Sequence, residues 1–164
     1  MLLRRYSRVM DALVHVIKGF LAVSLSIMTI VTVLEVVRRY MFGLSYPWAE
    51  ELVRFMLIWV TFVGGAAAFR SGNLVILDTV LTFLSERKRN IVNLMTNTVI
   101  LGFLIFLFKN GIKYAFSPVI SRQISPGLEL PMTVIYISIP LGFALMILFS
   151  LEIYGLTIQK LRKE

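Results

Sequence analysis

Four apolar runs, each long enough to form a helix across a membrane, are the feature that most constrains the fold. They cover residues of about 19–37, 52–69, 91–108 and 131–155. A hydrocarbon core about 30 Å thick needs roughly 20 apolar residues in a helix. Hydrophobic residues make up 58% of the chain and the mean hydropathy is +0.84, whereas soluble domains are about 45–50% apolar. The sequence therefore predicts an all-α membrane protein, with residues 1–164 forming a single four-helix transmembrane domain.

The first apolar run is expected to remain as a span. A signal peptide would continue into a cleavage site of small residues, but this run ends at Glu35-Val-Val-Arg-Arg39. In the last run, Pro140 predicts a kink, because proline interrupts the hydrogen bonds of a helix.

The connections between the spans also predict structure. In residues 38–51, Pro47 followed by two acidic residues is typical of a helix N-terminus. Residues 75–84 are apolar but too short to cross, so we expect a short amphipathic helix in the interface with Asp78 on its polar side. Ser85 is then expected to cap the next long helix.

The distribution of basic residues predicts the topology. Four spans place both termini and the second connection on one side of the membrane. That side carries 11 of the 17 Lys and Arg residues, and the opposite side carries 6. Because cytoplasmic segments are enriched in Lys and Arg, both termini are predicted to be cytoplasmic.

The composition excludes several kinds of site. The chain has no cysteine and one histidine, His15, which excludes thiolate metal sites, multi-histidine metal centres and a haem held by two of its own histidines. Its net charge of +8 is spread between the apolar runs, so it does not indicate a nucleic-acid partner. The sequence predicts neither a cofactor nor a metal.

No sequence motif supports an enzyme. Ser7, Asp11 and His15 lie four residues apart, which superficially resembles a hydrolase triad, but a triad also needs an oxyanion hole and tertiary positioning. P-loop, dinucleotide-binding and zinc-ligand patterns are absent from the sequence.

Glu35 is the single charged residue in the first span. Arg38 and Arg39 follow it at the helical spacings that allow an ion pair. Two interpretations are open: a polar anchor that contacts a partner protein, since charges in membranes usually face protein or water, or a snorkelling cluster at the membrane surface.

A second polar cluster stands at the start of the second span. Trp48, Glu50, Glu51 and Arg54 lie within seven residues, and Glu50 and Arg54 have the spacing of an i,i+4 pair. An aromatic belt with acids at a helix N-terminus explains each residue singly. It explains less well why two acids and an arginine lie at the N-terminal end of a span.

Small and amide residues in the spans predict helix packing. Gly64 and Gly65 begin a run of five small residues, which permits the close approach of another helix. Asn93, Thr96 and Asn97 are expected to form hydrogen bonds between helices.

Motifs in matching order along nearly the whole chain resemble one known family. They are Glu35-Val-Val-Arg-Arg-Tyr40-x-Phe-Gly, Ser45-x-Pro-Trp-Ala-Glu-Glu51-Leu-x-Arg54, the run from Trp59 to Arg70, Arg70-x-Gly72 followed by Asp78, Gln123-x-Ser-Pro126, and Pro131-Met-x-x-x-Tyr136-x-x-x-Pro140-Leu-Gly. The series resembles the small membrane subunit (DctQ/SiaQ type) of tripartite ATP-independent periplasmic (TRAP) transporters. Members often carry a histidine where this chain has Leu74, so the chain departs from the family pattern at that position.

The resemblance implies a non-catalytic scaffold in a three-part importer of a bacterial inner membrane. Its partners would be a large elevator-type membrane subunit, a periplasmic solute-binding protein and membrane lipids. The system would import a carboxylate solute, such as a C4-dicarboxylate, sialic acid or another organic acid, in symport with sodium. The resemblance, together with the packing argument for the glycines, assigns scaffold or interface roles to Glu35, Arg38, Arg39, Trp48, Glu50, Glu51, Arg54, Gly64, Gly65, Arg70, Asp78 and Pro131.

Two other functions remain open at this point. One is a self-sufficient four-span transporter acting as a homodimer, in which Glu35 would be the coupling residue. The other is the membrane anchor of a redox enzyme, against which the single histidine argues.

Overall fold

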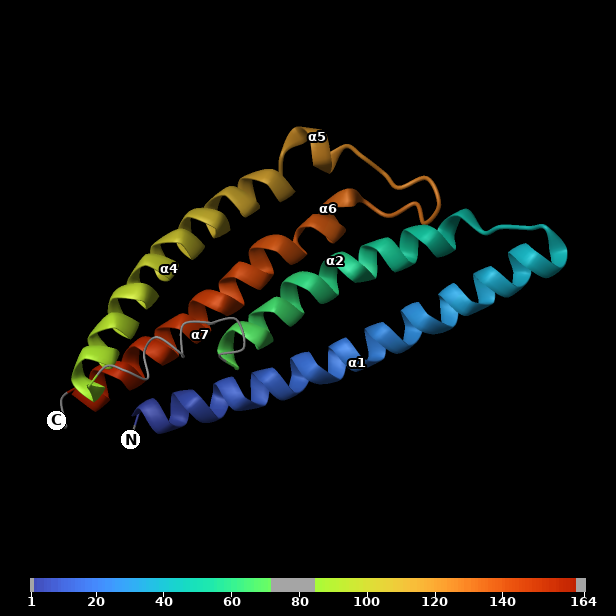
Figure 1. Ribbon diagram of the computed structural model, residues 1–164. Coiled ribbons are helices and arrows are strands. Elements are labelled where there is room, and N and C mark those ends of the chain that lie inside the picture. Colours follow the sequence, from blue (N-terminus) through green and yellow to red (C-terminus); the bar gives the residue numbers. More distant parts are fainter. Residues whose placement is uncertain (1, 72–84, 162–164) are drawn as a thin grey trace.

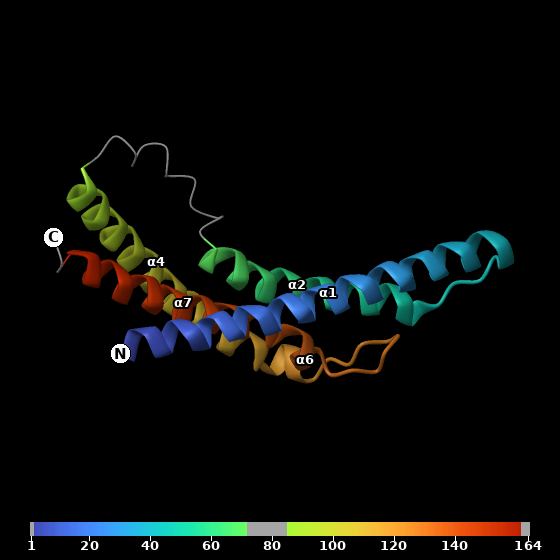
Figure 2. The ribbon, with the colours of Figure 1, turned by 90° about the horizontal axis from the view of Figure 1, so that it is seen from below.

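The computed structural model describes residues 2–71 and 85–161, with side-chain surroundings from Tyr6 onward. Four helical regions in this part are long and apolar enough to cross a membrane. Figures 1 and 2 show them as long, roughly side-by-side rods, with both chain termini at the same end of the molecule. The chain is therefore a multi-pass α-helical membrane protein, as the apolar runs predict.

Helix α1 (Leu2–Phe42) is 41 residues long, or about 60 Å at 1.5 Å per residue. It continues past the expected end of the first span until Gly43, whose φ of +67° is left-handed. The N–H of Gly43 donates to the carbonyl of Arg39 at 3.1 Å, as in a glycine-terminated helix. The helix thus extends about twice as far as a hydrocarbon core requires.

Helix α2 (Pro47–Arg70) begins at Pro47, as predicted, and helix α4 (Glu86–Ala115) begins directly after Ser85. Ser85 occupies the predicted capping position, but its side chain makes no capping hydrogen bond. The expected interfacial helix at residues 75–84, with Asp78 and Leu74, lies outside the described residues.

The last part of the chain contains two short helices and one long one. Helix α5 (Pro118–Ser121) lies in the third connection, and α6 (Met132–Tyr136) is separated from α7 (Ser138–Leu161) by a break at Ile137. Pro140 explains this break, because it has no N–H for the carbonyl of residue 136 and its ring crowds that carbonyl. The helix is thus interrupted near the position at which Pro140 predicts a kink.

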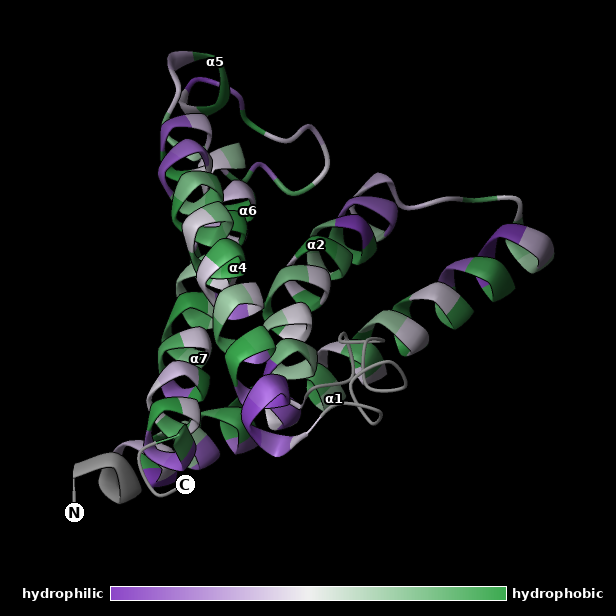
Figure 3. Ribbon diagram, turned by 60° about the vertical axis from the view of Figure 1, so that its left-hand side comes forward, coloured by the Kyte–Doolittle hydropathy of each residue, from purple (hydrophilic) through white to green (hydrophobic). Residues whose placement is uncertain are grey.

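The helices form a row in the order α1, α2, α7, α4. Helix α7 packs mainly against α4 and α2, and α2 packs on its other side against α1. Figure 3 shows hydrophobic residues along the middles of the helices and hydrophilic residues towards their ends. Many large apolar side chains are exposed, including Ile30 at 58% and Val99 at 74%, as expected where lipid covers them.

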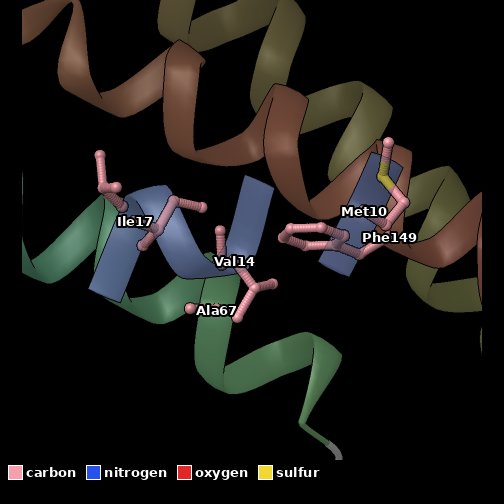
Figure 4. Close-up of a cluster of buried hydrophobic side chains, with 7 residues drawn as sticks. Met10, Val14, Ile17, Ala67 and Phe149 are labelled. Carbon is pink, nitrogen blue, oxygen red and sulfur yellow. The ribbon is translucent and has the colours of Figure 1, made fainter. Parts of the chain in front are cut away.

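The main apolar core lies between α1, α2 and α7, and Figure 4 shows its side chains in close-up. Helix α1 contributes Met10, Val14 and Ile17, α2 contributes Val63, Ala66 and Ala67, and α7 contributes Phe149. Phe149 and Ala66 are fully buried. This core is where α1 is held against the other helices.

Small residues let these helices approach closely. A Cβ on Gly64 would lie 3.2 Å from Leu21 of α1, and one on Gly65 would lie 3.2 Å from Met146 of α7. Gly142 of α7 is tighter still, because a Cβ there would lie 2.8 Å from the Phe62 carbonyl oxygen of α2. The run of small residues therefore serves helix packing on two faces, inside this chain.

Candidate scaffold and subunit-interface site

Arg70 ties three helices together at the end of the molecule near the termini. Its Nε donates to Glu152 Oε2 at 2.7 Å, and its Nη2 donates to Glu152 Oε1 at 2.9 Å. Nη2 also lies 2.8 Å from Asp11 Oδ1. The side chains of Arg70 and Glu152 are only 17% and 6% exposed, whereas that of Asp11 is 63% exposed.

The contacts of Arg70 hold helices of this chain together. The two parallel N–H···O bonds between Arg70 and Glu152 form the bidentate arrangement that is strongest for a guanidinium and a carboxylate. The guanidinium carbon of Arg70 also lies 5.6 Å from the centre of the Phe149 ring. The charges of Arg70, at the end of α2, and of Glu152, within α7, are therefore paired with each other inside the chain.

Asn97 joins α4 to α7 in the same way. Its side-chain nitrogen donates to the Ser150 carbonyl at 3.0 Å, and Ser150 Oγ donates back to Asn97 Oδ1 at 2.8 Å. Both residues are buried. The expected hydrogen bond between helices is confirmed for Asn97.

At the opposite end, Glu35 fastens the loop between α1 and α2. Its Oε1 accepts from Ser45 Oγ at 2.6 Å and from the N–H of Tyr46 at 3.1 Å. The ion pair with Arg38 or Arg39 that the helical spacing allows is not among those of the described residues, because the loop folds back and its donors bind the carboxylate. Glu35 thus positions the entry into α2.

Arg38 and Trp48 flank this loop. The guanidinium of Arg38 lies 3.2 Å from the centre of the Tyr46 ring, and that ring lies 5.5 Å from the Trp48 ring. All three residues line an open, mainly apolar groove of about 390 Å³. The Nη1 atom of Arg38 is buried and has no hydrogen-bond partner in the part of the chain that the structure describes.

The expected i,i+4 pair of Glu50 with Arg54 is also wrong. Glu50 instead approaches Arg39 of α1 at 3.9 Å, with both side chains more than half exposed. Exposed pairs are worth about 0–1 kcal/mol, so a nearby cation on another helix is enough to redirect the carboxylate. Arg54 lines a second groove beside α1.

Glu51 holds a distant loop. Its Oε2 accepts from Ser125 Oγ at 2.7 Å and from the N–H groups of Gly127 and Leu128 at 3.0 Å each. Pro131, predicted as a scaffold residue, stands at the end of this loop, directly before α6, and forms an isolated bridge with Ile124. The start of α2 and the third connection are thus joined through one carboxylate.

The described residues contain no group of three or more His, Cys, Asp and Glu side chains that could hold a metal ion. The Ser7–Asp11–His15 trio is not a triad: His15 Nδ1 lies 2.9 Å from the Asp11 carbonyl, and the Asp11 carboxylate faces Arg70.

The most important residue missed by the sequence analysis is Glu152. It is the one acidic residue in the last apolar run, and charges in spans require partners. The predicted topology already put it on the same side as Arg70, so a search for the acid that neutralises Arg70 would have found it. No comparable sequence pattern indicates close packing at Gly127 and Gly142, because the residues that crowd them lie far away along the chain.

These features together define a multi-pass helical membrane protein whose polar groups connect its own helices and loops. Comparison with known proteins narrows the class. The family model described as "Tripartite ATP-independent periplasmic transporters, DctQ component" matches residues 28–159. The chain belongs to this family of small TRAP-transporter membrane subunits, which consists of transporter components and not of enzymes.

Three curated relatives are similar to the chain. It is 29% identical over 114 residues to the C4-dicarboxylate TRAP transporter small permease protein DctQ of Rhodobacter capsulatus, covering 68% of this chain and 49% of that protein. It is 28% identical over 127 residues to the ectoine TRAP transporter small permease protein TeaB of Halomonas elongata, covering 75% and 64%.

The third relative is the isethionate TRAP transporter permease protein DctMQ of Oleidesulfovibrio alaskensis, 25% identical over 99 residues, which cover 60% of this chain and 16% of that protein. The chain therefore spans less than two thirds of the length of the curated relatives that it matches. No solved structure matches it.

Proposed function

We propose that this chain is the scaffold subunit of a TRAP transporter. In this role it packs against a large elevator-type membrane subunit and helps to dock a periplasmic solute-binding protein during sodium-coupled import of an organic acid. The chain itself carries neither the solute nor the sodium ion.

The observation that carries the proposal is the surface around the C-terminal half of α1. Apolar side chains are exposed there, including Leu34 at 63% and Met41 at 71%. Among them lies the buried Nη1 of Arg38, which has no hydrogen-bond partner within the described residues, while the guanidinium lies on the Tyr46 ring. Leaving a buried charged donor unsatisfied costs free energy, and an acceptor on a second protein removes that cost.

The relatives support a larger assembly. The aligned part of the DctMQ permease protein is only 16% of its length, so a segment similar to this chain occurs within a much longer permease. The three relatives are named for different solutes, which supports placing the choice of solute in the other components. C4-dicarboxylates, sialic acid and other organic acids are all candidates.

We further propose that the chain lies in a bacterial inner membrane with both termini in the cytoplasm. The basic residues support this orientation, because 11 of the 17 lie on the side of the termini. The loop at residues 43–46 and the loop bound by Glu51 then face the periplasm.

A self-sufficient transporter is the alternative that this site disfavours. Such a protein needs an ionisable group facing a cavity within the membrane. The carboxylate of Glu35 is instead bound to Ser45 and to the N–H of Tyr46 near a helix end.

The test is co-purification from cells that express the tagged chain with its genomic neighbours. We expect a large hydrophobic protein in equimolar amount. Arg38→Leu is expected to lower the affinity of the complex about tenfold. A hydrogen bond to a charged group is worth about 1.5–3 kcal/mol, and about 1.4 kcal/mol corresponds to a factor of ten in affinity. Lys109→Leu, an exposed change on α4, is the matched control. Recovery of the chain alone, as a defined oligomer, would contradict the proposal.

A further inference from the structure

The groove that Arg54 lines is a second opening between α1 and α2, separate from the groove lined by Arg38. It has a volume of about 460 Å³. Apolar residues of both helices form its walls, among them Val36 of α1 and Val53 and Leu57 of α2. Val36 is 48% exposed and Leu57 is 52% exposed, so the groove is open along its length to whatever surrounds the helices.

The groove is charged at the end away from the chain termini and apolar further along. Arg39 of α1 and Glu50 of α2 lie at the charged end and approach each other at 3.9 Å. Arg54 lies one helical turn beyond Glu50, two residues inside the apolar run 52–69. Figure 3 shows hydrophilic residues at this end of α1 and α2 and hydrophobic residues further along both helices. The groove therefore changes from charged to apolar in the direction of the bilayer centre.

The guanidinium of Arg54 has no ion pair and no hydrogen bond within the part of the chain that the structure describes. The acids around it have other contacts. Glu50 approaches Arg39, and Glu35 accepts from the loop before α2. Glu51 attracts Arg54 electrostatically, but its Oε2 accepts three hydrogen bonds from the third connection. A charged side chain at the edge of a span requires a polar partner, and this groove leaves the donors of Arg54 available to one.

We propose that this groove binds one phospholipid, with the phosphate on Arg54 and an acyl chain along the apolar walls. A guanidinium can donate two parallel hydrogen bonds to a phosphate. A phospholipid is favoured over a second protein because its phosphate already lies at this depth of the bilayer. A carboxylate of a second protein would have to be transferred from water to the same position, at a cost in desolvation. The inference does not depend on the proposed function.

The experiment measures the binding of phosphatidylglycerol by native mass spectrometry. The full chain is purified in mild detergent, together with the proteins that stay bound to it, and the lipid is titrated. We expect one phosphatidylglycerol molecule to bind wild type more tightly than any further ones. Arg54→Gln is expected to raise its dissociation constant about tenfold, equivalent to about 1.4 kcal/mol. Arg122→Gln, which removes an exposed arginine at the same end of the molecule, is the matched control and should bind as wild type does.

Two further measurements separate the phosphate from the acyl chain. A diacylglycerol with the same chains lacks the phosphate, so wild type and Arg54→Gln should bind it equally. Leu57→Trp narrows the groove and keeps the arginine, and it should also weaken the binding of phosphatidylglycerol. If Arg54→Gln does not fold, Leu57→Trp decides the question.

Two results would overturn the inference. One is an equal dissociation constant of phosphatidylglycerol for wild type and Arg54→Gln, which is expected if a second protein covers the groove. The other is an unchanged constant for Leu57→Trp, because the lipid would then bind through its charge alone, outside the groove.

Discussion

The bidentate pair between Arg70 and Glu152 gives the sharpest prediction about stability. Glu152→Ala leaves a guanidinium that is only 17% exposed without its main partner. Removing one partner of a buried pair costs about 3–5 kcal/mol. We expect the lower end, about 3 kcal/mol, because Asp11 remains 2.8 Å from Nη2.

Asp11→Asn is the matched comparison, since it removes the other carboxylate from the same arginine. The Asp11 side chain is 63% exposed, so Asp11→Asn should lower the free energy of unfolding by only about 0–1 kcal/mol. The double variant Arg70→Leu with Glu152→Leu should lie within about 1 kcal/mol of wild type, because apolar residues often replace a buried ion pair without loss.

The assay is reversible unfolding in detergent, followed by the fluorescence of the two tryptophans, Trp48 and Trp59. The free energy of unfolding is compared across the four proteins. Equal, small losses for Glu152→Ala and Asp11→Asn would refute the reasoning, because burial would then have no influence on the strength of the pair.

Three further predictions use other contacts. Gly142→Ala should lower the free energy of unfolding by about 1–3 kcal/mol, because its Cβ would lie 2.8 Å from the α2 backbone. Gly102→Ala is the control: its Cβ would meet nothing within 4 Å, so the same measurement should show a neutral or stabilising effect. Asn97→Ala should cost about 1–2 kcal/mol, since it removes two hydrogen bonds to α7; an unchanged free energy of unfolding would contradict this. The chain has no cysteine, so Glu129→Cys should react with an impermeant thiol reagent outside the cell and Lys88→Cys only after permeabilisation; labelling from the same side would reject the proposed orientation.

The fold was predictable from the sequence where the physical cause is local. Apolar runs of sufficient length have few alternatives to crossing a membrane as helices, and proline at a helix start predicted the beginning of α2 at Pro47. The break before Pro140 followed from the same chemistry. These outcomes depend on neighbouring residues only.

The candidate site was less predictable because its contacts are distant in sequence. The rule for i,i+4 pairs assigned partners to Glu35 and Glu50, but the folded loop and the neighbouring helix offered other donors. Glu51 was predicted as a scaffold residue, yet nothing local indicates that its partners come from residues 125–128. Such contacts are set by the arrangement of the whole bundle.

The most direct test of the central claim is sodium-driven uptake in proteoliposomes with single components omitted. The components are this chain, the large membrane subunit and the periplasmic binding protein. We predict uptake only when all three are present, with no uptake by this chain alone. Uptake by this chain alone, abolished by Glu35→Gln, would contradict the scaffold function and identify a self-sufficient transporter.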